Sequence, residues 1–137
     1  MVNESQGCRS FIACPTMPKH LLIADDNTII REVVKESLQM MPEVEDCREA
    51  VNGRDAVEKA KENKPDLIIL DQAMPEMNGV QAAKILKESM PAVPIVLFTM
   101  YPVGRWANDL GIDAVVEKPD GIGRLAECVQ SLLASSR

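Results

Sequence analysis

Five side chains that could do chemistry stand at the ends of short apolar runs of this sequence. Two carboxylates, Asp25 and Asp26, follow the first run, and a third, Asp71, follows another. Two later runs end at the hydroxyl of Thr99 and the ammonium of Lys118. If these runs are parallel strands of one open sheet, their carboxyl ends meet at one edge, which is where such sheets bind ligands. The sequence therefore predicts a polar site at that edge.

The carboxylates of this site indicate a divalent cation. Three carboxylates within a few ångströms of one another cannot all stay ionised without one. Mg²⁺ is favoured over a fully caged Ca²⁺, because one or two carboxylates suffice as direct ligands and water or phosphate oxygens complete the octahedron. A soft metal is not expected, since neither Cys nor His accompanies the acids. We therefore expect Mg²⁺ as the cofactor.

Five segments are predicted to be strands. Four of them are short apolar runs without alternation, as in strands that are covered on both faces; they are residues 21–24, 67–70, 95–98 and 114–116. Residues 44–50 mix apolar side chains with charged ones, which fits a more solvated edge strand. The sheet should thus have mostly interior strands.

Two segments carry apolar residues at the spacing of one helix face. The first face consists of Ile30, Val33, Val34, Leu38 and Met41, and the second of Leu125, Cys128, Val129, Leu132 and Leu133. Both patterns follow i, i+3, i+4 steps, so both faces should cover the sheet.

The remaining helices are predicted from their starts. Asn52 and Asn78 each precede a glycine and an Ala-rich charged stretch, and Asn is a strong N-cap. Residues 102–110 have only a short, poorly patterned helical stretch. Strict alternation of strands and helices implies right-handed crossovers and an α/β fold. We predict a doubly wound five-stranded parallel sheet in the flavodoxin-like order 2-1-3-4-5, with helices on both faces and the site between strands 1 and 3.

The bulk composition fits one domain. The chain has 137 residues, of which 46% are hydrophobic, enough for a single core. Residues 1–18 lack periodicity and are predicted to be a loosely ordered leader, with the domain over 19–137. A net charge of -6 argues against direct nucleic-acid binding, because phosphate contacts need clustered Lys and Arg. No apolar run approaches the roughly 20 residues that span a bilayer, so no membrane partner is expected.

The cysteines indicate reduced thiols. They show no CxxC spacing and have a single histidine, His20, for company, which makes a zinc site improbable; they are Cys8, Cys14, Cys47 and Cys128. Thiols of this kind are typical of the cytoplasm, where we expect the protein to act.

Four motifs together resemble the receiver domain of the two-component response regulator family. Asp25-Asp26-Asn27 resembles its acidic pair, and the run LDQAMPEMNG over residues 70–79 its phosphoacceptor loop. Phe98-Thr99 resembles its hydroxyl position and Glu117-Lys118-Pro119 its lysine. The resemblance covers about residues 19–134. It implies bacterial phosphorelay signalling by a phosphoprotein that is not an enzyme beyond its own phosphorylation and autodephosphorylation.

The resemblance assigns roles at the acidic site. Asp71 would accept a phosphoryl group from a phosphohistidine of a sensor histidine kinase, forming an aspartyl phosphate that binds the metal as well. Asp26 and the backbone carbonyl of Ala73 would ligate Mg²⁺ directly, and Asp25 would hold it partly through water.

The resemblance also implies how the signal leaves the site. Lys118 would supply a second positive charge, aimed by a cis bond to Pro119, and Thr99 would donate a hydrogen bond to the phosphoryl group. The output face would be the fourth helix, fifth strand and fifth helix. It would serve a homodimer, a downstream protein or an output domain. Residues 42–44 and 49–53 resemble the corresponding stretches of receivers that usually precede a helix-turn-helix domain.

Two positions depart from the family pattern. Val115 stands three residues before the lysine, where the family usually has an aromatic ring, so a rotamer switch of that ring is not available. Met100 follows the hydroxyl residue, where a small side chain is usual, and its length is expected to crowd the phosphoryl pocket. Tyr101 or Trp106 could report the switch instead.

Three other functions share features with this site. A haloacid dehalogenase-type phosphohydrolase needs a second carboxylate two residues after the nucleophile, where this chain has Ala73. A flavodoxin is disfavoured because Asp25 and Asp26 would repel a flavin phosphate. The remaining alternative is a pseudo-receiver, a protein-interaction module without regular phosphorylation, which the complete set of site residues argues against.

Overall fold

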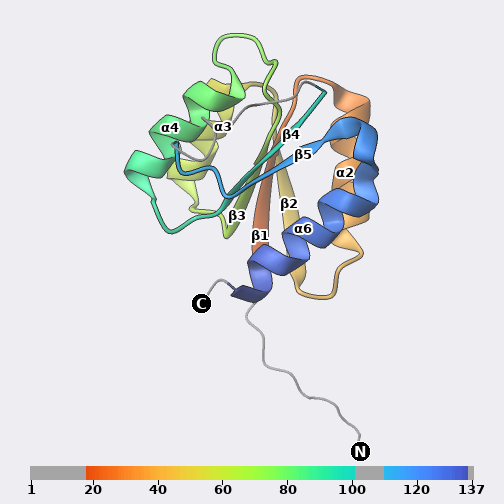
Figure 1. Cartoon of the computed structure of the whole chain (residues 1–137). Helices are drawn as coiled ribbons and strands as arrows, with labels where there is room; N and C mark the ends of the chain where they lie inside the picture. The colour runs from red at the N-terminus through yellow and green to blue at the C-terminus, as the bar shows by residue number, and fades with distance from the viewer. Residues whose placement is uncertain (1–17, 101–109, 136–137) are drawn as a thin grey trace, which may run out of the picture.

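The computed structural model describes residues 18–100 and 110–135, which form one five-stranded sheet with helices on both faces (Figure 1). The strand order is β2-β1-β3-β4-β5 and all pairs are parallel. The elements are β1 (Lys19–Ala24), α2 (Thr28–Gln39), β2 (Val44–Ala50), α3 (Gly53–Glu62), β3 (Leu67–Leu70), α4 (Gly79–Ser89), β4 (Ile95–Thr99), β5 (Ala114–Glu117), the 3₁₀ turn η1 (Lys118–Asp120) and α6 (Gly121–Ser135). The predicted fold class and strand order are confirmed.

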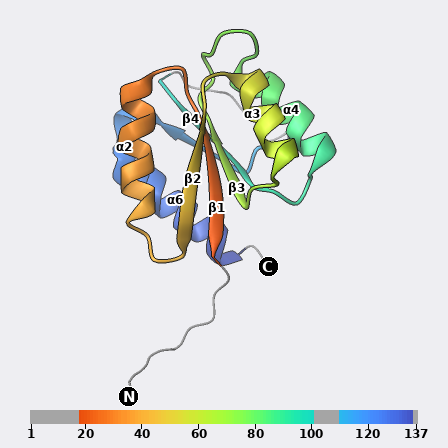
Figure 2. The same ribbon diagram turned by 180° about the vertical axis from the view of Figure 1, so that it is seen from behind.

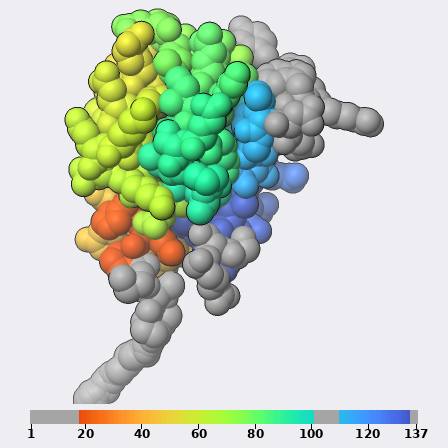
Figure 3. Space-filling model, turned by 90° about the vertical axis from the view of Figure 1, so that its left-hand side faces the viewer, coloured from red at the N-terminus to blue at the C-terminus, as the bar shows by residue number. Residues whose placement is uncertain are grey.

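The two faces of the sheet are covered by different helix pairs. Helices α2 and α6 cover one face, and α3 and α4 the other (Figures 1 and 2). Alternate residues of β1 pack against the two helix layers, because successive side chains of a strand point to opposite faces. Leu21 and Ile23 pack with α2 and α6, whereas Leu22 and Ala24 pack with α3 and α4. Figure 3 shows α3 and α4 side by side on the outside of their layer.

An asparagine side chain begins each of the first three helices. The Oδ1 atoms of Asn27, Asn52 and Asn78 accept hydrogen bonds from the backbone N–H three residues later, at 3.1, 2.7 and 2.9 Å. The caps predicted at Asn52 and Asn78 are confirmed, and Gln81 completes a capping box with Asn78. Because Asn27 caps α2, the two acids before it are not the N-cap of that helix.

One residue of the predicted α2 face lies elsewhere. Val33 is 43% exposed, whereas Arg31, Val34 and Leu38 are buried. These three follow i, i+3, i+7 spacing, and Val33 falls on the flank of that stripe. The prediction was wrong here because Arg31 occupies the interior position that an apolar residue was expected to fill.

The edge position predicted for residues 44–50 is confirmed, since β2 lies at the end of the sheet and pairs with β1. The helix predicted over 102–110, with Tyr101 and Trp106, lies outside the described residues except at its last position, as does nearly all of the 1–18 leader. None of the described helices combines the length and the apolar character that a membrane crossing requires.

Candidate functional site

The carboxyl edge of the sheet brings the predicted site residues to the ends of neighbouring strands. Asp25 directly follows β1 and Asp71 directly follows β3, and these two strands pair through Ala24 and Leu70. The backbone N–H of Asp71 donates to the carbonyl of Ala24 at 2.9 Å. The strand ladder therefore continues to the acids themselves and places them side by side.

The three acids form one cluster. One oxygen from each of Asp25, Asp26 and Asp71 lies within 4.8 Å of the others. Asp25 and Asp71 are buried, at 3% and 6% exposure, while Asp26 is exposed. Of the described residues, these three make up the group of His, Cys, Asp and Glu that could hold a metal ion. Hard oxygen ligands from carboxylates fit a divalent cation such as Mg²⁺.

Lys118 lies between the two buried carboxylates. Its Nζ is 2.8 Å from Oδ2 of Asp25 and 3.3 Å from Oδ2 of Asp71. The ammonium also lies over the ring of Phe98, 5.9 Å from the centroid. Burial alone would lower the pKa of Lys118, but its hydrogen bonds and charge interactions with the two carboxylates outweigh burial and raise that pKa. The lysine is therefore held in its charged form.

One lysine does not neutralise the cluster. Burial, and then the charge of Asp25, raise the pKa of Asp71 above its ordinary value, although Lys118 opposes both. A raised carboxyl pKa means that the folded protein disfavours the ionised form. A further cation would remove this penalty, so the electrostatics of the cluster match the metal site that its geometry allows.

The lysine reaches the acids without a cis peptide bond. No cis bond occurs in residues 18–100 and 110–135, so the bond between Lys118 and Pro119 is trans and the predicted cis isomer was wrong. Strand β5 pairs with β4 as far as Thr99 and Glu117, which places Lys118 at the site edge. Pro119 then lies in the first turn of η1, where the fixed φ of proline is tolerated.

Thr99 is the last residue of β4 and is fully buried. It lies on the strand next to β3, at the same edge as Asp71. Met100, which follows it, is 56% exposed. That exposure argues against the predicted crowding of the site by Met100, and Val115 on β5 is also part-exposed, at 37%.

The loop after Asp71 is packed closely against its own backbone. Gly79 donates its N–H to the carbonyl of Gln72 at 3.0 Å, and Oε1 of Gln72 accepts from the N–H of Val80 at 2.9 Å. A Cβ atom at Gly79 would collide with the carbonyl oxygen of Asp71. Ala73 lies exposed within this loop, and the metal-ligand role of its carbonyl stays a prediction.

One residue that contacts the site was missed from the sequence. Arg31 of α2 is buried, and its Nη1 donates to the backbone carbonyl of Asp25 at 2.7 Å. The available signal was its spacing, three and seven residues before the buried Val34 and Leu38. A charged residue in an apolar stripe is unfavourable unless it is paired, so the spacing of Arg31 indicates a buried partner.

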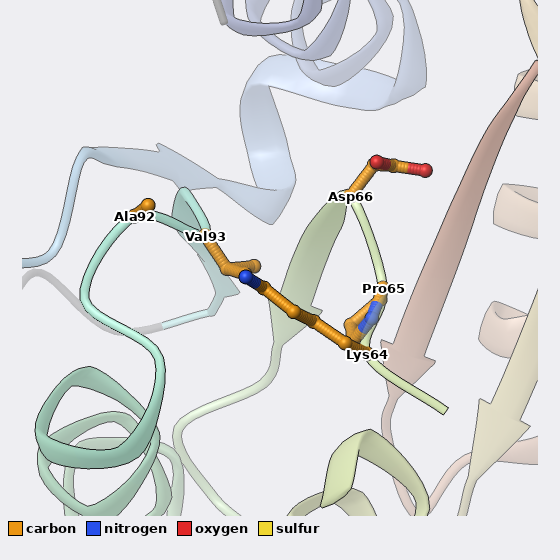
Figure 4. A pocket seen from close by; sticks show the side chains of 5 residues that line it. All are labelled: Lys64, Pro65, Asp66, Ala92 and Val93. Atoms are coloured by element: carbon orange, nitrogen blue, oxygen red, sulfur yellow. The ribbon is translucent and has the colours of Figure 1, made fainter. Parts of the chain in front are cut away.

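A separate hollow lies at the opposite, amino edge of the sheet (Figure 4). Its volume is about 130 Å³ and it is lined by Lys64, Pro65, Asp66, Ala92 and Val93. The carboxylate of Asp66 points away from Lys64 and accepts a hydrogen bond from the N–H of His20 at 2.8 Å. The hollow is far along the strands from the acidic cluster and shares no residue with it.

Comparison with known proteins points to one family. The model of the response regulator receiver domain matches residues 21–130. A response regulator protein VraR of Staphylococcus saprophyticus is 34% identical over 118 residues, covering 83% of this chain and 56% of that protein. A protein-glutamate methylesterase/protein-glutamine glutaminase of Carboxydothermus hydrogenoformans is 40% identical over 105 residues, covering 74% of this chain and 30% of that protein. The chain thus spans about half or less of the length of these relatives.

Solved structures give the same picture. The receiver domain of AraT, a response regulator from Geobacillus stearothermophilus, is 32% identical, with a TM-score of 0.78 over 86% of this chain and 95% of that one. A CheY-like receiver domain protein from Methanospirillum hungatei has a TM-score of 0.80 over 87% of this chain and 96% of that one. At 23% identity this second likeness shows the fold alone.

Proposed function

Because the chain belongs to the response regulator receiver domain family of two-component systems, we propose that Asp71 accepts a phosphoryl group from the phosphohistidine of a sensor histidine kinase. In this transfer the N–P bond of the donor breaks and an O–P bond forms to a carboxylate oxygen of Asp71. The observation that carries the proposal is the cluster of three acids within 4.8 Å, with Lys118 between the two buried ones.

The acidic cluster would hold Mg²⁺ for this transfer. Asp25, Asp26 and Asp71 would provide carboxylate oxygens, and Ala73 a backbone carbonyl oxygen. When bound, Mg²⁺ supplies positive charge that offsets the charge of the phosphoryl oxygens. The raised pKa of Asp71 supports this assignment, since the cluster lacks enough positive charge of its own.

Two residues of the chain would act on the transferred group directly. The Lys118 ammonium, held in its charged form, neutralises phosphoryl oxygens next to Asp71. The Thr99 hydroxyl donates a hydrogen bond to one of them, a charge-assisted bond of about 1.5–3 kcal/mol. Phosphorylation adds about -1.5 to -2 charges at Asp71. Thr99 and Lys118 contact this added charge only in the phosphorylated protein, and these contacts shift the equilibrium toward the signalling conformation.

The signal would leave through the face formed by the end of β4, β5 and α6. Part-exposed Val115 and exposed Met100 give this face an apolar component. We assign it to contact with a partner, either a second copy, a downstream protein or an output domain. Light scattering of the phosphorylated and unphosphorylated protein tests the second copy, and an unchanged monomer mass would exclude it.

Phosphorylation is tested by intact-mass measurement after incubation with Mg²⁺ and acetyl phosphate, a small acyl phosphate donor. The native protein should gain the mass of one phosphoryl group, and the gain should disappear when Mg²⁺ is chelated. Asp71→Asn should gain none. Asp113→Asn is the matched control, because Asp113 is a part-buried, lysine-paired carboxylate at the opposite edge, and it should be phosphorylated like the native protein.

Two results would overturn the proposal. One is a folded native protein that gains no mass from acetyl phosphate or from a phosphorylated histidine kinase. The other is an Asp71→Asn variant that is labelled as fully as the native chain. The first result would favour an interaction module without phosphorylation, and the second a different acceptor.

A further inference from the structure

Arg31 is the one buried polar side chain, among those described, to which the proposed phosphoryl transfer gives no role. The buried polar residues are Asp25, Arg31, Asp71 and Thr99, and the other three belong to the site. The guanidinium of Arg31 makes directed contacts. Nη1 donates to the carbonyl oxygen of Asp25 at 2.7 Å, Nε donates to Oε1 of Glu49 at 3.0 Å, and Nη2 lies 3.5 Å from Oγ1 of Thr28.

The carbonyl that Arg31 contacts belongs to the peptide that joins the two neighbouring acids. In an extended strand successive side chains point to opposite faces, so Asp25 and Asp26 would diverge if β1 continued. Instead β1 ends at Ala24 and the chain bends at Asp26, and both carboxylates reach the cluster with Asp71. The orientation of this one peptide therefore decides whether the two acids converge.

The bend leaves a carbonyl that needs a donor. A buried backbone carbonyl without a partner is costly, and the carbonyl of Asp25 has left the strand ladder. The other polar atoms of Asp25 are held as well: its N–H donates to the carbonyl of Ala50 at 3.2 Å, Oδ1 accepts from the N–H of Asn27 at 2.9 Å, and Oδ2 accepts from Lys118 at 2.8 Å. Arg31 thus completes a set of contacts that fixes the peptide and the side chain together.

The guanidinium is itself anchored from the edge strand. Glu49 lies at the end of β2 and accepts from Arg31 at 3.0 Å and from Nζ of Lys35 at 3.3 Å. The backbone carbonyl of Glu49 accepts from Nζ of Lys59 at 2.5 Å. Glu49 is therefore tied to both α2 and α3, and it gives Arg31 a fixed base from which to hold the Asp25 carbonyl.

We propose that Arg31 is a positioning residue: by holding the peptide between Asp25 and Asp26, it makes the two carboxylates converge and so sets the affinity of the acidic cluster for Mg²⁺. The inference rests on the proposed Mg²⁺ site. Partners that orient metal ligands without touching the metal change affinity by about 10–100-fold when they are removed.

Calorimetric titration of the full chain with MgCl₂ tests the role. Arg31→Met keeps most of the apolar stem but removes all the donors, and its Mg²⁺ dissociation constant should rise at least about 10-fold. Arg31→Lys keeps the positive charge but lacks the rigid fork of donors that the guanidinium presents, so it should recover only part of the affinity. Glu49→Gln weakens the contact with Oε1 that anchors the guanidinium of Arg31, and it should have a smaller effect on the dissociation constant than Arg31→Met.

Lys87→Met is the matched control for a loss of stability alone. Lys87 is also a part-buried cation that contacts a carboxylate and backbone carbonyls, but at the amino edge of the sheet: its Nζ lies 2.9 Å from Asp113 and donates to the carbonyls of Val93 at 2.8 Å and Pro91 at 3.4 Å. This variant should lose free energy of unfolding and keep the native Mg²⁺ dissociation constant. In ¹⁵N–¹H spectra without metal, Arg31→Met should shift the amide signals of Asp26 and Asn27, and Lys87→Met should not.

The outcomes separate this inference from the proposed function. A native protein that binds Mg²⁺, with an Arg31→Met variant that binds it equally well, overturns the role of Arg31 and leaves the site intact. If Arg31→Met does not fold, unchanged affinity in both Arg31→Lys and Glu49→Gln overturns it instead. A native protein that binds no Mg²⁺ removes the metal site itself, and this inference with it.

Discussion

The two edges of the sheet use the same kinds of charged residue in opposite ways. At the amino edge, Lys87 pairs with Asp113 at 2.9 Å and His20 contacts Asp46 at 2.8 Å. Asp113 also accepts a hydrogen bond from the N–H of Ile95 at 2.8 Å. These carboxylates each have a partner of their own and help to fix the starts of the strands. At the carboxyl edge, three carboxylates lie within 4.8 Å of one another around one lysine.

This difference identifies the functional edge more sharply than the presence of polar residues does. An uncompensated charge in a buried setting lowers stability. The strand geometry does not require such a charge, because the same five strands form both edges and the amino edge has its carboxylates paired. Where a protein departs from a locally favourable arrangement such as full charge pairing, the departure is usually at a functional site. We therefore interpret the excess of negative charge around Asp25 and Asp71 as the feature that serves a cation and a phosphoryl group.

The largest expected contrast comes from removing one lysine at each edge. Lys118→Met leaves two buried carboxylates without their cation, and breaking a buried pair in this way costs about 3–5 kcal/mol. Lys87→Met breaks a pair whose carboxylate is 34% exposed, and it should cost about 1–2 kcal/mol. Urea unfolding without divalent ions measures both free energies, and equal losses would contradict the contrast between the edges.

Addition of Mg²⁺ should stabilise the protein through the carboxyl edge only. At a concentration about 100-fold above the dissociation constant, ligand binding raises the free energy of unfolding by about 2.7 kcal/mol. Asp26→Asn removes an exposed member of the cluster without disturbing the core, and most of the stabilisation should be lost. Asp113→Asn should respond to Mg²⁺ like the native chain. Thermal unfolding with and without MgCl₂ would reject the site if both variants responded alike.

The fold and the main site residues could be predicted because few physical rules decide them. Apolar runs without alternation have to be covered on both faces, which predicts an α/β sheet. Parallel strands then end at one edge, so the residues after each run meet there. Asp25, Asp71 and Lys118 came together for that reason, without any knowledge of their contacts.

What the sequence did not predict depends on side-chain partners and on local backbone choices. Arg31 was not expected inside because a charged residue is normally exposed, and only the carbonyl of Asp25 and the carboxylate of Glu49 make its burial favourable. The isomer of the Lys118–Pro119 bond was predicted wrongly, because the register of β5 already delivers the lysine. The nearer contact of Lys118 with Asp25 than with Asp71 also depends on three-dimensional packing.

Two glycines allow a comparison at nearly equal cost in stability. Gly79→Ala would push its methyl group against the carbonyl of Asp71, and overpacking of this kind costs about 1–3 kcal/mol. Gly111→Ala, at the amino edge, meets only the flexible side chain of Lys87 at 3.4 Å but has a φ of +81°, which costs about 1–2 kcal/mol.

The two variants should differ in function although they resemble each other in stability. Gly79→Ala displaces the backbone of Asp71, the proposed phosphoacceptor, so acetyl phosphate should label it more slowly than the native protein. Gly111→Ala should be labelled at the native rate. If both variants lost labelling in proportion to their stability, the close packing behind Asp71 would have no specific role in the reaction.

The smallest expected effect on stability is at Glu49. Its carboxylate lies at the carboxyl edge of the sheet but, like the carboxylates at the amino edge, it is paired with cations of its own. The hydrogen bond from Arg31, with further help from Lys35, lowers the pKa of Glu49 below its ordinary value. A lowered folded-state pKa stabilises the fold above the unfolded-state pKa, and this contribution is lost as the pH falls through the folded-state value. Since Glu49 is partly solvent-exposed, screening limits the contribution to about 0.5 kcal/mol.

Glu49→Gln should therefore reduce the free energy of unfolding by a constant amount near neutral pH, and the difference from the native chain should shrink at acid pH, below the unfolded-state value. Urea unfolding across that range measures it. In an Arg31→Met background the same substitution should show much less pH dependence, because the largest cause of the lowered pKa is gone. An undiminished pH dependence there would mean that Arg31 does not hold Glu49, and Arg31 would then lack the fixed base from which it positions the acidic pair.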